Sequence, residues 1–214
     1  MKSLILIYLL GAVIAHCAEQ VSSIMTVDGK HVDSKKVEEF IAWAEPSIRE
    51  YPPHFKDADQ EKRINLSTLL VTNEITKLDP KKIKDAVLLT NLGHILAMGN
   101  NLDLPGGEQA KVFFERALSL DPKSRRANYL FGMYLISTSK FHMESLPYLQ
   151  KAYVLGEKDA QYSVGLLLCE KGDKTNGLKE LESYSLANPN NESVKQVIKA
   201  TKDGTLEIKR TNND

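Results

Sequence analysis

Residues 159–189 place small side chains where the two helices of a helical hairpin would touch. The stretch reads DAQYSVGLLLCEKGDKTNGLKELESYSLANP, with Gly165 in its first helical segment and Gly177 in its second. A residue without a side chain lets two helices approach closely, so these glycines predict a tight contact that Leu181 fills. Pro189 predicts the end of the second helix, because proline lacks the amide hydrogen needed to continue it.

Two upstream stretches repeat this arrangement. Residues 82–122 carry Leu89, Leu92, Gly93 and Leu96 in the first segment and Ala110, Phe114, Ala117 and Pro122 in the second. Residues 124–156 carry Phe131, Gly132 and Leu135, then Ser145, Leu149 and Ala152, and end in Gly156 instead of proline. The connection inside the first of these units is longer and holds loop residues, among them Asn101 and Pro105.

These positions resemble the tetratricopeptide repeat, and the run KAYVLGEKDAQYSVG resembles the related Sel-like repeat. The resemblance covers residues 82–200 closely and residues 33–80 loosely. It implies an all-α fold, a right-handed superhelix of antiparallel helix pairs whose neighbours stack into one continuous core.

The expected organisation follows from these patterns. We expect a signal peptide over residues 1–18, a flexible arm or small hairpin over 19–33, and a helical pair forming a degenerate repeat over 34–80. Three repeats and a capping helix would follow over 81–202, with a disordered polar tail over 203–214.

The N-terminus has the order of a secretory signal peptide. Lys2 precedes an apolar run over residues 4–15, and the small residues Ala15, Cys17 and Ala18 follow. This pattern predicts export to the periplasm and a mature chain that begins near Ala18 or Glu19. An uncleaved anchor or a buried first helix is the plainer alternative. A second alternative is an outer-membrane lipoprotein acylated on Cys17, although His16 departs from the lipobox pattern, which has a small residue there.

Charge and residue spacing disfavour several functions. Lysine plus arginine and aspartate plus glutamate both number 28, so no net field attracts nucleic acid or an anionic membrane. The histidines His31, His54, His94 and His142 show no metal-ligand spacing, and no glycine-rich phosphate loop follows a strand. Cys169 lies in an apolar run and is expected to be a buried thiol. We therefore expect no enzyme activity, cofactor, metal or small-molecule substrate, and a membrane contact only if Cys17 is lipidated.

The resemblance implies that the first helix of each pair lines a concave groove. This predicts a partner-binding groove formed by Thr90, His94, Arg126, Tyr129, Met133, Tyr162 and Leu166. Repeats of this family that hold a C-terminal carboxylate use Lys and Asn at corresponding positions, and none matches here. The lining is apolar and aromatic, which suits a helix or an extended segment with apolar anchors. In the alternative interpretation these side chains are core, and the N-terminal helices fill the groove.

The sequence therefore predicts a non-enzymatic protein–protein interaction scaffold of the bacterial cell envelope. Its partner would be a peptide or helix segment of an assembly such as a secretion, pilus or wall-remodelling machine. The alternative is a regulatory or inhibitory module of an envelope hydrolase.

Overall fold

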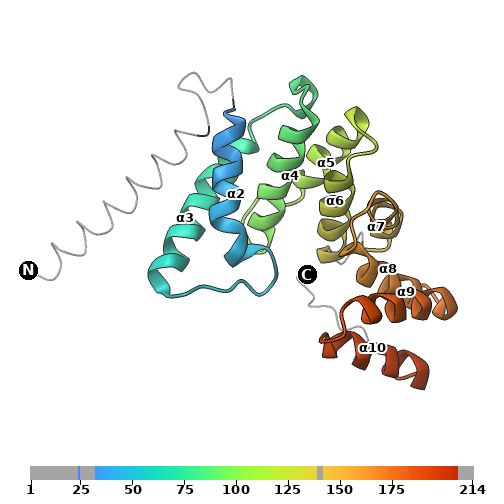
Figure 1. The fold of residues 1–214 in the computed structure, drawn as a ribbon. Coiled ribbons are helices and arrows are strands. Elements are labelled where there is room, and N and C mark those ends of the chain that lie inside the picture. Colours follow the sequence, from blue (N-terminus) through green and yellow to red (C-terminus); the bar gives the residue numbers. More distant parts are fainter. Residues whose placement is uncertain (1–23, 25–31, 139–141, 207–214) are drawn as a thin grey trace, which may run out of the picture. The chain divides into compact units, whose positions relative to one another are not determined.

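The computed structural model describes residue 24, residues 32–138 and residues 142–206 (Figure 1). Over this part of the chain the secondary structure is helical and holds no β-strand, which confirms the all-α prediction there. The predicted signal peptide, most of the predicted arm and residues 207–214 of the predicted tail lie outside the described residues. The chain divides into two compact units, residues 1–120 and residues 121–214.

The first unit contains four α-helices in its described part. They are α2 (Ser34–Ile48), α3 (Ala58–Ile75), α4 (Ala86–Asn100) and α5 (Gln109–Leu120), with a short 3₁₀ turn η1 (Pro80–Lys82) before α4. Aspartates cap three of these helices. The side chains of Asp33, Asp57 and Asp85 accept hydrogen bonds from backbone amides of the first turns of α2, α3 and α4. Such caps satisfy amides that have no partner within the helix, which fixes where each helix begins.

The second unit contains α6 (Arg125–Ser137), α7 (Ser145–Val154), α8 (Ala160–Glu170), α9 (Lys174–Ala187) and α10 (Glu192–Asp203), with the 3₁₀ turn η2 (His142–Glu144) before α7. Ser124, Asp173 and Asn191 cap α6, α9 and α10 in the same manner. Helix α9 ends two residues before Pro189, as the sequence predicts. Gly204 ends α10 with a positive φ of 73°, a conformation that glycine adopts without strain.

Glycines lie at the contact of each of the three predicted helix pairs. The most extensive contacts join α4 with α5, α6 with α7, and α8 with α9. A Cβ built on Gly132 would lie 2.5 Å from Cγ of Leu149, and one on Gly165 would lie 2.7 Å from Cγ of Leu181. These distances are too short for real side chains, so both positions require glycine. The predicted close contacts at Gly132 and Gly165 are thus confirmed.

Helices α2 and α3 both pack on α4. Their main contacts are with α4 and not with each other. Both helices are needed to cover α4, because its residues from Leu89 to Leu96 are all buried. A helix that is buried around its circumference must be covered on several sides. Pro46 does not end α2, which continues to Ile48.

We expect that Gly165→Leu destabilises the protein by about 1–3 kcal/mol, because the new side chain would overlap Leu181 and the backbone of Gly177. The matched control Thr175→Leu adds a leucine at an exposed position of α9 and should change stability little. Urea denaturation measures both free energies of unfolding. Equal stability of the two variants would contradict the observed packing of α8 on α9.

Candidate functional site

The predicted groove residues fall in both units of the fold. Thr90 and His94 lie on α4 of the first unit, whereas Arg126, Tyr129 and Met133 lie on α6 of the second. Tyr162 and Leu166 lie on α8, also in the second unit. The two sets therefore belong to different units.

Thr90 and His94 are buried within the first unit. The Thr90 hydroxyl donates a hydrogen bond to the carbonyl of Ala86, at 2.7 Å, within its own helix. His94 is only 5% exposed. Its Nε2 lies 3.1 Å from Oε1 of Glu45 on α2. Helix α2 thus contacts α4 at His94, and both predicted groove residues on α4 are buried.

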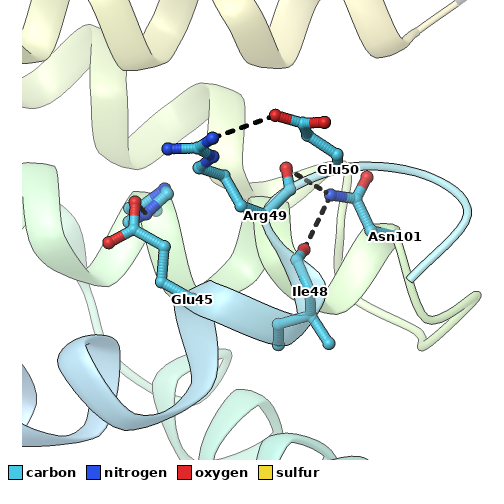
Figure 2. A network of polar contacts seen from close by, with 6 residues as sticks. Glu45, Ile48, Arg49, Glu50 and Asn101 are labelled. Carbon is cyan, nitrogen blue, oxygen red and sulfur yellow. Dashed lines mark hydrogen bonds and ion pairs between the residues drawn. The ribbon is translucent and has the colours of Figure 1, made fainter. Parts of the chain in front are cut away.

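The C-terminal end of α2 is held by a residue that the sequence analysis assigned only to a loop. Nδ2 of Asn101 donates hydrogen bonds to the carbonyls of Ile48 and Arg49, both at 3.0 Å (Figure 2). Carbonyls at a helix end lack partners within the helix, so Asn101 satisfies groups that would otherwise be left unpaired. Arg49 in turn pairs with Glu50 at 3.0 Å. The two hydrogen bonds from Asn101 link the C-terminal end of α2 to the end of α4.

In the second unit, Tyr129 packs between helix pairs. Its ring contacts a buried cluster contributed by α7 and α8, made of Leu146, Leu149, Ala152, Ala160, Val164 and Leu167. Tyr129 is half-buried, so one part of its ring fills the fold while another part remains accessible.

Tyr162 and Leu166 occupy the corresponding place on α8. Both are half-buried and pack against a second buried cluster, formed by Cys169, Leu181 and Val194. The rings of Tyr162 and Tyr184 lie with centroids 5.5 Å apart. Burial, and secondarily the neighbouring Tyr184, raise the pKa of Tyr162. The phenol is therefore neutral near pH 7 and remains a hydrogen-bond donor.

Met133 and Arg126 are the exposed members of the predicted set. Met133 is 36% exposed, although its neighbours Gly132 and Tyr134 are buried. The hydroxyl of Ser163 on α8 lies 3.8 Å from the Met133 sulfur, where it can donate a weak hydrogen bond. This contact joins the accessible surface of α6 to that of α8.

We call these residues the α6–α8 face. Arg126, Tyr129 and Met133 lie three or four positions apart on α6, and Tyr162 and Leu166 lie four apart on α8. Ser163 is included because its hydroxyl contacts Met133. The members are Arg126, Tyr129, Met133, Tyr162, Ser163 and Leu166. Ser163 was not predicted, because its contact with Met133 joins two separate helices and leaves no spacing pattern in the sequence.

Over residues 32–138 and 142–206, no group of three histidine, cysteine, aspartate or glutamate side chains could hold a metal ion. Nε2 of His142 lies 3.2 Å from Oε1 of Glu170 on α8. The Cys169 thiol is buried, and this burial raises its pKa. A raised pKa keeps a thiol protonated and unreactive.

No helix among the residues that the structure describes is long and apolar enough to span a membrane. No protein-family model, curated protein or solved structure matches the chain. The likeness to tetratricopeptide and Sel-like repeats therefore rests on residue positions within this sequence.

Tyr162 should stabilise the fold as well as form part of the α6–α8 face. We expect Tyr162→Ala to lower the free energy of unfolding by about 2 kcal/mol, below the roughly 3–5 kcal/mol typical of a fully buried aromatic ring. Tyr162→Phe retains the ring contact with Tyr184 and should stay close to the unchanged protein. Chemical denaturation would compare the two variants. If Tyr162→Ala is as stable as Tyr162→Phe, the ring does not support the fold.

Proposed function

We propose that this chain is a non-enzymatic scaffold that binds a segment of a partner protein on the α6–α8 face. The observation that carries the proposal is the exposure of Met133 together with its contact to Ser163. The apolar side chain of Met133 is partly exposed to water and contacts α8. It therefore offers apolar area that a partner can bury.

The composition of the face supports a protein partner. Tyrosine, methionine and arginine are enriched at protein interfaces, and tyrosine and arginine often carry much of the binding energy. Tyr129 and Tyr162 are half-buried, so their rings are already held in place before binding. Ordered side chains lose less conformational entropy when a partner binds. A helix or an extended peptide with apolar anchors fits this surface best.

We also propose that the helix pairs continue one another as a right-handed superhelix of tetratricopeptide or Sel-like type. The support is the recurrence of glycine against a large side chain in the pairs α6–α7 and α8–α9, within one unit. In such folds each pair buries its apolar face only by stacking on its neighbour.

The proposed location is the periplasm, with an outer-membrane lipoprotein as the alternative. Its support is the signal-like sequence of residues 1–18, which lies outside the described residues. Mass spectrometry of the protein from its native host should find an N-terminus near Ala18 or Glu19. An intact Met1 in a soluble cytoplasmic fraction would contradict export, and a lipid on Cys17 would establish the alternative.

Regulation or inhibition of an envelope hydrolase is the second candidate. It would use the same α6–α8 face, with the enzyme as the partner. A pull-down with and without hydrolase substrate separates the candidates, because a substrate that competes for the enzyme's active site would release an inhibitor but not a scaffold.

The binding face can be tested with a photo-crosslinking amino acid placed at position 133 in cells. We expect it to crosslink to one defined partner, and we expect Met133→Glu to weaken binding of that partner at least tenfold, or about 1.4 kcal/mol. Position 154 is the matched control, because Val154 on α7 is an apolar side chain that is 84% exposed and lies outside the face. Val154→Glu should leave binding unchanged.

Two results would contradict the proposed face. Equal crosslinking from positions 133 and 154 would indicate a surface contacted at random. A Met133→Glu variant that stays folded and binds the same partner with unchanged affinity would place the binding site elsewhere.

A further inference from the structure

The last helix of the described chain, α10, is held by few buried side chains. Of its 12 residues only Val194 and Thr201 are buried. Val197 and Ile198 are half-buried against the cluster of Cys169 and Leu181. By comparison, α8 buries six of its 11 residues. A terminal element with so little buried area opens at a lower free energy than the whole fold.

The polar contacts of α10 add little to its docking. Lys202 pairs with Glu182 of α9 at 2.7 Å, but both side chains are about half exposed. Exposed ion pairs contribute little, because water and salt screen them. Pro189 and Asn190, between α9 and α10, are exposed and form a short connection that can act as a hinge. A detached helix of the length of α10 is only marginally stable in water. Undocking of α10 would therefore also unfold it.

Helix α10 shares its docking site with the proposed binding face. Val194 lies in the same cluster as Cys169 and Leu181, and Tyr162 and Leu166 pack against that cluster. When α10 leaves, the apolar sides of Tyr162 and Leu166 would gain exposure. The surface of α8 that a partner could use is therefore larger without α10 than with it.

We propose that α10 is a displaceable cover, and that the partner replacing it is an amphipathic helix with the same apolar pattern. The pattern is Val194, Val197, Ile198 and Thr201, at positions i, i+3, i+4 and i+7. This inference rests on the proposed function and specifies its partner as a helix that competes with α10. Binding would be weakened by the free energy needed to open α10, so the cover regulates affinity.

Cys169 provides a direct reporter of the cover. The thiol is buried, lies in one cluster with Val194, and has Thr201 of α10 as a polar neighbour. Opening of α10 removes both neighbours and exposes the sulfur. The full chain with Cys17→Ser leaves Cys169 as its single thiol.

The first experiment measures the reaction rate of Cys169 with an aromatic disulfide reagent at increasing urea. We expect a rate that depends weakly on urea at low concentration, because local opening exposes little surface. Val194→Ala should raise this rate at least tenfold, and the milder Val197→Ala should raise it less. Val154→Ala is the matched control and should not change it, because Val154 is exposed on α7. If the reaction rate of Cys169 follows global unfolding at every urea concentration, α10 does not open locally and the proposal of a displaceable cover is wrong.

The second experiment tests the class of partner. A fluorescent peptide of residues 191–206 is titrated into the full chain, and its anisotropy is followed. We expect Val194→Ala protein to bind the peptide at least tenfold more tightly than the unchanged protein, because its own α10 competes less. A peptide with Val194→Ser and Ile198→Ser should not bind. Equal binding of both peptides, or no binding to Val194→Ala protein, would overturn the assignment of an amphipathic helix. Neither experiment uses Met133, so failure of the binding face and failure of the cover give different results.

Discussion

The close approach of paired helices at glycine is the constraint on which the second unit depends. At Gly132 and Gly165 the leucine of the following helix occupies the space that a Cβ would need. Each leucine is fully buried. Leu149 belongs to the cluster that joins α7 to α8, and Leu181 belongs to the cluster that joins the pair α8–α9 to α10. The same leucine therefore fixes the spacing within a pair and supplies apolar area for the next one. A substitution of either glycine is therefore expected to disturb the contact within the helix pair and the packing of that pair on the next helix.

This packing also determines which side chains remain available to a partner. Tyr129 and Tyr162 direct part of their rings into the clusters, so they support the fold and retain an accessible edge. Met133 has no comparable place in either cluster and stays partly in water beside Ser163. In the first unit the outcome differs, because His94 is buried against Glu45 of α2 and Thr90 is also buried. The surface that supports the proposed function is thus confined to helices of the second unit.

The sequence predicted the features that local spacing determines. The glycine contacts, the end of α9 before Pro189 and the burial of Cys169 all follow from the properties of single residues. It did not predict contacts that depend on docking between distant elements. The pairing of His94 with Glu45 and the capping of α2 by Asn101 join residues about 50 positions apart. Nothing in the pattern of α2 indicated that it would pack on α4 in preference to α3. Similarly, Tyr162 could not be assigned to core or surface from helical spacing, because it takes part in both.

In each helix pair of the second unit, a leucine contacts the backbone of a glycine. Nuclear Overhauser spectroscopy on methyl-labelled protein measures these contacts directly. We expect strong cross-peaks from the Leu149 methyls to the Hα protons of Gly132, and from the Leu181 methyls to those of Gly165, since these atoms lie within contact distance. If both leucines give cross-peaks to other core residues but none to these glycines, the packing described for the second unit is contradicted.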